Sequence, residues 1–251
     1  MKILRILSLF CFLASTFLTA QNKEFTLDEI WSGTFRTEGL DALHSMNNGQ
    51  QYSVLNFDRA SATTTIDIYD YKTLEKVKTL VSSKDLDLKY FSDYTFSKDE
   101  NKILLAFEEE SIFRRSSLGK YVVYDVSEKS IHSVANHKIQ EPTFSPDGKK
   151  VAYGYQNNLY VKNLETNDVT QLTFDGKKNK VINGITDWVY EEEFGFVRAF
   201  DWNADSNKIA FIRFDESDVP EFSMDVYGKD LYQTQTVFKY PKAGERNAVV
   251  S

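Results

Sequence analysis

The chain has 251 residues, 41% of them hydrophobic, with only 11 glycines and four prolines, a composition that excludes collagen-like, linker-type and disordered chains. Thirty basic residues stand against 37 acidic ones, the net charge is −7, and the basic residues form no long cluster, so we expect no nucleic-acid partner. Aromatic residues make up 14% of the chain, which favours sheet-rich structures.

Residues 1–20 have the order of a secretory signal peptide: basic residues, then a mostly apolar stretch, then small residues that end at Ala20. The apolar stretch is short for a membrane-spanning helix and no second candidate follows it, so a membrane anchor is the weaker alternative. The only cysteine, Cys11, lies inside this segment, so the mature chain is expected to contain no disulfide and no cysteine-bound metal. We therefore expect export to the periplasm, the cell surface or the medium, without stable membrane insertion after cleavage.

The chain from about Gln51 onward is predicted to form consecutive short strands. Short runs of β-branched and aromatic residues alternate there with polar turns, and no long stretch keeps a helical period. The clearest predicted strands are residues 51–57, 64–69, 102–107, 120–125 and 158–162.

A weak repeat is superimposed on this strand pattern. Each copy has an aromatic residue at a strand end, a turn that carries Asp, and a strand that begins with Ile or Val and reaches Ala beside an aromatic residue. The copies are residues 94–107, 143–153 and 200–211. They recur at about the 40 to 50 residues of one β-propeller blade, and the second interval is longer because it contains an insertion.

These observations predict an all-β fold. Residues 41–251 are expected to form an incomplete β-propeller of about four to five four-stranded blades with a short helical insertion. Residues 21–40 are expected to form a separate N-terminal segment. A blade buries its faces only against neighbouring blades, and residues 247–251 have the pattern of a strand that is just beginning. We therefore expect a piece of a longer protein, with a small complete propeller as the alternative.

The sequence contains no pattern of a catalytic nucleophile or a bound cofactor. It has no G-x-S-x-G nucleophile elbow, no phosphate-binding loop and no dinucleotide fingerprint. The histidines, His44, His132 and His137, have no cysteine or carboxylate at metal-ligand spacing, and we expect them at the surface. We predict no catalytic residue, no metal site and no cofactor in this chain.

Residues 183–195 interrupt the strand pattern. Thr186 or Asp187 can cap a short helix that carries residues 188–190 inward and the consecutive glutamates 191–193 at its far end. Adjacent carboxylates raise each other's pKa unless a cation lies between them, and a primary ammonium, with its three donors and one positive charge, suits two such acceptors. The alternative is a solvated acidic face, because the glutamates at 108–110 form a similar run elsewhere.

The run from Asn183 to Phe194 closely resembles the glutamate motif of the dipeptidyl peptidase IV family of serine exopeptidases, which lies in their propeller domain. Residues 112–116 resemble the arginine segment of that family, and the likeness extends in register from about Phe25 to the last residue. Further similar segments are residues 144–148, 209–224 and 238–245.

The resemblance implies roles for individual residues. Family members remove a dipeptide from the free amino end of a peptide, usually after Pro or Ala in the second position. Glu192 and Glu193 would then bind the terminal ammonium of the substrate, whereas Glu191 would have a structural role. Arg114 would contact the carbonyl of the first peptide unit and order the glutamates, and Arg115 beside it is the alternative. An arginine at this place would favour the charged form of both carboxylates.

The family's catalytic Ser, Asp and His lie in a C-terminal α/β-hydrolase domain that is absent from these residues, so the chain alone is expected to be inactive. The resemblance implies the N-terminal, substrate-recognition part of an exported serine dipeptidyl peptidase that acts on Xaa-Pro and Xaa-Ala peptides with a free N-terminus. Full-length members are often homodimers. The alternatives are a non-catalytic propeller that binds peptides or proteins, and a fragment of a prolyl tripeptidyl peptidase.

Overall fold

The computed structural model describes residues 24–37, 39 and 42–251, and the chain divides into two compact units, residues 1–41 and 42–251. The predicted signal peptide, residues 1–20, lies outside the described residues. Within the described part of the chain, no helix is long and apolar enough to cross a membrane.

The described part of the first unit contains one short helix, α2 (Leu27–Trp31). Thr26 forms a capping box with Glu29: Thr26 Oγ1 accepts the N–H of Glu29 at 3.1 Å, and the Glu29 carboxylate accepts the N–H of Thr26 at 3.1 Å. The rings of Phe25 and Phe35 meet edge to face at 5.0 Å. Because a helix of five residues is too short to be stable by itself, these local contacts are what support it.

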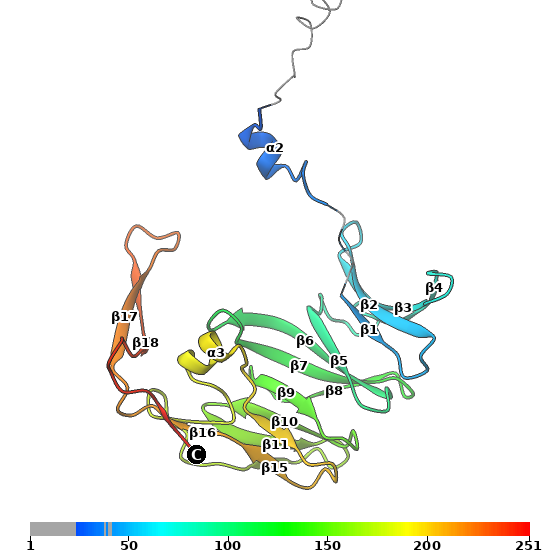
Figure 1. Cartoon of the computed structure of the whole chain (residues 1–251). Helices are drawn as coiled ribbons and strands as arrows, with labels where there is room; N and C mark the ends of the chain where they lie inside the picture. The colour runs from blue at the N-terminus through cyan, green and yellow to red at the C-terminus, as the bar shows by residue number, and fades with distance from the viewer. Residues whose placement is uncertain (1–23, 38, 40–41) are drawn as a thin grey trace, which may run out of the picture. The chain divides into compact units, whose positions relative to one another are not determined.

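The second unit begins with three four-stranded antiparallel sheets, each built from consecutive strands (Figure 1). The first sheet contains β1 (Leu43–Ser45), β2 (Gln51–Asp58), β3 (Thr63–Asp70) and β4 (Lys76–Ser82). The second contains β5 (Asp93–Phe96), β6 (Lys102–Ser111), β7 (Ser117–Asp125) and β8 (Ser130–Ser133), and the third contains β9 (Gln140–Phe144), β10 (Lys150–Tyr155), β11 (Asn158–Asn163) and β12 (Val169–Gln171). All the strands predicted above are confirmed, as β2, β3, β6, β7 and β11. The β6–β7 hairpin is longer than predicted, because its pairing continues to Ser111 and Ser117.

Beyond β12 the sheets are smaller. β13, β16 and β19 form a three-stranded sheet, while β14–β15 and β17–β18 are two-stranded. The bounds are β13 (Val181–Asn183), α3 (Trp188–Phe194), β14 (Phe200–Trp202), β15 (Ile209–Phe211), β16 (Arg213–Asp215), β17 (Glu221–Val226), β18 (Thr234–Lys239) and β19 (Val249–Val250). The all-β prediction is confirmed, and the predicted helical insertion is present as α3.

The sequence repeat corresponds to a structural repeat. Each copy forms an antiparallel strand pair that places the aromatic residue opposite Ile or Val: Phe96 opposite Ile103, Phe144 opposite Val151, and Trp202 opposite Ile209. The first two copies also share their turn chemistry, since Ser97 Oγ donates to Asp99 at 2.6 Å and Ser145 Oγ donates to Asp147 at 2.5 Å. In the first two copies the same turn therefore directs the same strand register.

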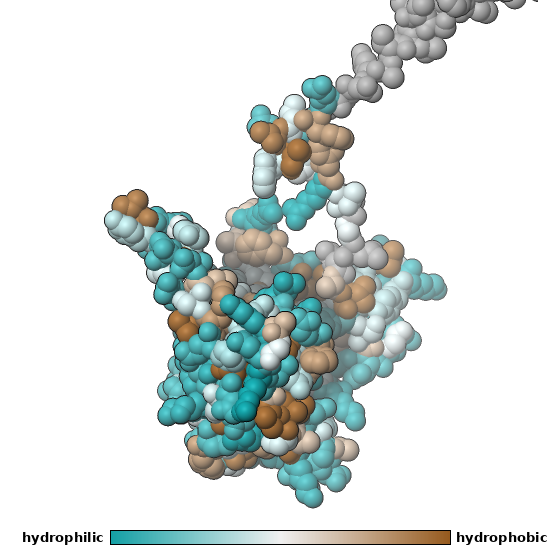
Figure 2. All heavy atoms as spheres, turned by 60° about the vertical axis from the view of Figure 1, so that its left-hand side comes forward, coloured by the Kyte–Doolittle hydropathy of each residue, from teal (hydrophilic) through white to brown (hydrophobic). Residues whose placement is uncertain are grey.

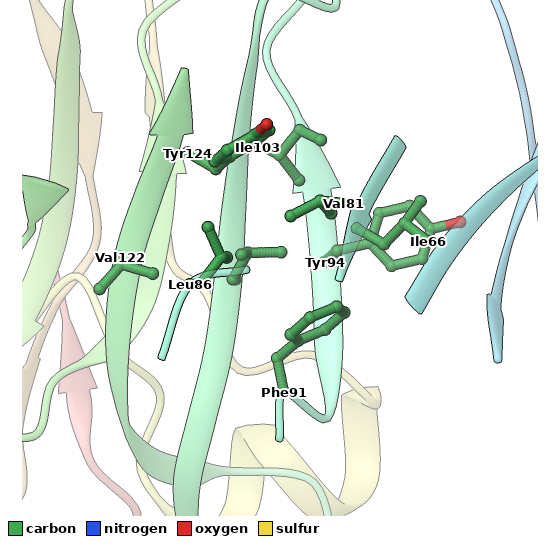
Figure 3. Close-up of a cluster of buried hydrophobic side chains, with 9 residues drawn as sticks. Ile66, Val81, Leu86, Phe91, Tyr94, Ile103, Val122 and Tyr124 are labelled. Carbon is green, nitrogen blue, oxygen red and sulfur yellow. The ribbon is translucent and has the colours of Figure 1, made fainter. Parts of the chain in front are cut away.

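The hydrophobic core lies between successive sheets. Ile66 of the first sheet packs in one cluster with Ile103 of β6 (Figure 3). Leu105 of β6 belongs to the same cluster. Leu104, between them in sequence, belongs instead to the cluster with Val151 of the third sheet, because successive side chains of a strand point to opposite faces. The second sheet is thus buried on both faces by its neighbours, which is the packing of propeller blades.

The β17–β18 hairpin extends away from the sheets (Figure 1). Its tip carries Tyr227, Leu231 and Tyr232, which are 79%, 90% and 78% exposed, and Figure 2 shows hydrophobic side chains at this end. The base of the hairpin returns to the sheets close to α3, as the ring contacts described below show.

Candidate functional site

Helix α3 starts and ends where its local sequence chemistry directs. Asp187 is the N-cap, and its carboxylate accepts the N–H of Tyr190 at 3.0 Å. Gly195 ends the helix in the left-handed conformation, with φ of 74°, and its N–H donates to Glu191 O at 3.2 Å. Of the two caps considered above, Thr186 and Asp187, the structure uses Asp187.

The three glutamates of α3 have three different environments. Glu191 is only 1% exposed, whereas residues 188–190, predicted to point inward, are half-buried. Glu191 Oε1 accepts the backbone N–H of Arg115 at 2.7 Å and that of Ser116 at 2.9 Å. These two bonds compensate for the burial of a carboxylate, and they attach the tip of the β6–β7 hairpin to α3.

Arg114, at the hairpin tip, pairs with the second glutamate. Its Nε lies 3.1 Å from Glu192 Oε2, and the two side chains are 74% and 14% exposed. The Glu193 side chain is exposed, and within the described ranges it takes part in no hydrogen bond or ion pair. The structure therefore brings Arg114 and Glu192 together, and Arg114, not Arg115, carries the ion pair. Of the two neighbouring carboxylates, that of Glu192 is paired with an arginine and that of Glu193 is exposed.

A groove of about 870 Å³ is lined by residues of the hairpin tip, α3 and β18, among them Phe113 and Glu191, the sequence neighbours of Arg114 and Glu192. Three acidic side chains at most 5% exposed line it: Asp187, Glu191 and Glu216. Burial raises the pKa of Asp187, and burial together with the Asp187 charge raises the pKa of Glu216 to about 7, against the opposing effect of Lys239. The burial of Glu216 could not be predicted from the sequence, because this residue follows β16 in a polar, turn-like run that carries no local signal of burial.

Glu216→Gln should stabilise the chain at neutral pH. The folded carboxyl binds its proton more tightly than an unfolded one, for which the ordinary value is 4.5, so wild-type stability falls as pH rises from 4.5 through 7. The variant lacks this loss, and its free energy of unfolding should exceed that of the wild type by up to about 3 kcal/mol at pH 8 and by less than about 1 kcal/mol at pH 5. Urea unfolding at both pH values measures this, with Glu128→Gln, at an exposed glutamate, as the control. A difference independent of pH would contradict it.

The prediction for the histidines is wrong for one of them. His44 and His132 are exposed, but His137 is half-buried and stacks on Tyr155 at a ring separation of 3.7 Å. Burial lowers the pKa of His137. Its Nδ1 lies 2.7 Å from Asn136 Oδ1, while its buried Nε2 has no partner. The spacing of these histidines along the chain gave no indication of this stacking.

Several known proteins are similar to this chain in sequence. The family model for the dipeptidyl peptidase IV (DPP IV) N-terminal region matches residues 97–251. Human prolyl endopeptidase FAP is 32% identical over 233 residues, which are 91% of this chain and 29% of that protein. A probable dipeptidyl-aminopeptidase B of Talaromyces marneffei is 37% identical over 171 residues, which are 62% of this chain and 19% of that protein.

A solved structure shares the fold as well. The crystal structure of Porphyromonas gingivalis dipeptidyl peptidase 4 matches with a TM-score of 0.82 and 39% identity, over 91% of this chain and 33% of that chain. The chain thus spans about a third or less of the length of these relatives. The family model covers more than half of the chain, and the matched residues include both the β6–β7 hairpin and α3. The chain therefore belongs to the dipeptidyl peptidase IV N-terminal region family, as its motifs predicted.

Proposed function

We propose that the chain is the substrate-recognition part of an exported serine dipeptidyl peptidase, in which Glu192, Glu193 and Arg114 form an amine clamp. One observation carries this proposal: a carboxylate already paired with arginine stands next to an exposed carboxylate that has no partner within the described residues. Export rests on the sequence of residues 1–20 alone.

The amine clamp contributes to catalysis by positioning the substrate. A terminal ammonium has three donors, and two neighbouring carboxylates can accept from it in charge-assisted bonds. The Arg114 guanidinium balances part of the negative charge, so that a single positive amine leaves the set near neutrality. If the nucleophile of the whole enzyme lies at a fixed distance from this clamp, the distance selects the bond after the second residue.

The test is whether cleavage depends on the free amine. In the full-length protein that contains this chain, kcat/KM for Gly-Pro-p-nitroanilide should exceed that for the N-acetyl form by about 100-fold, because acetylation removes charge-assisted bonds that together contribute about 3 kcal/mol. Equal rates for the two substrates would refute the amine clamp. A longer peptide with Pro in the second and third positions, analysed by mass spectrometry, separates release of dipeptides from release of tripeptides.

A further inference from the structure

An aromatic cluster joins the two elements of the amine clamp to a third element. Phe238, near the end of β18, lies 5.7 Å from Phe113 and 6.2 Å from Trp188, measured between ring centroids. Phe222 of β17 and Tyr240 lie 6.0 and 6.3 Å from the same ring. The Phe238 ring is thus the point where the β6–β7 hairpin, helix α3 and the β17–β18 hairpin meet.

Two of the rings near Phe238, those of Phe113 and Trp188, are close in sequence to residues of the amine clamp. Phe113 immediately precedes Arg114, and Trp188 is the first residue of α3, one turn before Glu192. We propose that Phe238 is a positioning residue that holds Arg114 and Glu192 in register with each other. This inference rests on the proposed function, since it concerns the geometry of the amine clamp.

The hairpin tip needs a second attachment point. Glu191 bonds the backbone of Arg115 and Ser116, but both bonds go to one oxygen atom, so by themselves they leave the tip able to pivot about that atom. Contact between Phe113 and Phe238 adds a point on the other side of Arg114. Two separate points fix the direction of the hairpin tip, and with it the direction of an arginine side chain that is itself 74% exposed.

The Phe238 ring is held by a firmly attached base. β17 and β18 pair in register from Glu221 to Val226. At the base of the hairpin Lys239 Nζ donates to Val219 O at 2.7 Å, and the Tyr240 N–H donates to Pro220 O at 3.0 Å. The ring of Tyr240 also contacts Trp188 at 4.6 Å. The ring therefore projects from a braced strand end and can transmit its position to both neighbours.

The first test compares two substrates in the full-length protein. Phe238→Ala should lower kcat/KM for Gly-Pro-p-nitroanilide about tenfold, since small misplacements of binding groups have effects of this order or larger, and leave kcat/KM for the N-acetyl form unchanged. Phe238→Tyr keeps the ring and should preserve the ratio of the two rates. Phe211→Ala, which removes an exposed ring on β15, is the matched control and should change neither rate. Equal losses on both substrates would mean a general structural role and would overturn the inference.

The second test does not depend on activity. In the full-length protein, hydrogen–deuterium exchange should become faster in Phe238→Ala at residues 112–118 and 188–195, while Phe211→Ala should leave both segments unchanged. If the wild-type enzyme shows no preference for a free amine, the amine clamp is refuted, yet the exchange result still decides the role of Phe238. Unchanged exchange in both segments of Phe238→Ala overturns the positioning role whatever the rates show.

Discussion

Glu192→Gln should lower kcat/KM for Gly-Pro-p-nitroanilide by about 100-fold in the full-length protein, because one of the proposed charge-assisted interactions with the ammonium is lost and the pair with Arg114 is weakened at the same time. The Glu192 side chain is only 14% exposed, so solvent screens these interactions less than it would at a fully open site. Steady-state rates over a range of substrate concentrations measure the effect.

The same change should leave the N-acetyl substrate almost unaffected, since that substrate offers no ammonium. Glu193→Gln should reduce the rate on the free-amine substrate by a smaller factor of about ten, because its carboxylate is exposed and its interactions are more strongly screened. Glu165→Gln, at an exposed glutamate paired with Lys149, is the matched control. Unchanged kcat/KM in both Glu192→Gln and Glu193→Gln would rule out the assignment of the amine clamp.

Glu191→Ala should destabilise the folded chain by about 3 to 5 kcal/mol, the largest stability effect that we expect in this region. The substitution removes the only acceptor that the N–H groups of Arg115 and Ser116 have among the described residues, and Ser116 is only 3% exposed. A buried donor that loses its acceptor incurs its full desolvation cost, and the space left by the side chain adds to it. The free energy of unfolding in urea measures the change.

Glu191→Gln separates charge from hydrogen bonding. Its amide oxygen can still accept the two N–H groups, so the loss should be smaller, about 1 to 2 kcal/mol, and should reflect the weaker acceptor. Glu193→Ala, two residues along the same helix at an exposed position, should change stability by less than about 0.5 kcal/mol. A loss below about 1 kcal/mol in Glu191→Ala would contradict the structural role of this carboxylate.

The sequence by itself determined the features of this protein that depend on neighbouring residues. Strands β2, β3, β6, β7 and β11, the turns that carry Asp99 and Asp147, and the presence of a short helix at α3 could all be predicted from short segments, because turn chemistry and strand alternation act over a few residues. The glutamate and arginine motifs of the family can also be found from the sequence alone, because each is a short continuous run of residues.

The tertiary structure alone decided which of several similar residues does what. Glu191, Glu192 and Glu193 are chemically identical in the sequence, and only the approach of a hairpin some 75 residues earlier in the chain makes the first buried, the second paired and the third exposed. The choice between Arg114 and Arg115, the burial of Glu216 and the contacts of Phe238 were decided in the same way. Burial and charge pairing arise between segments distant in sequence, so no local pattern records them until the sheets are packed.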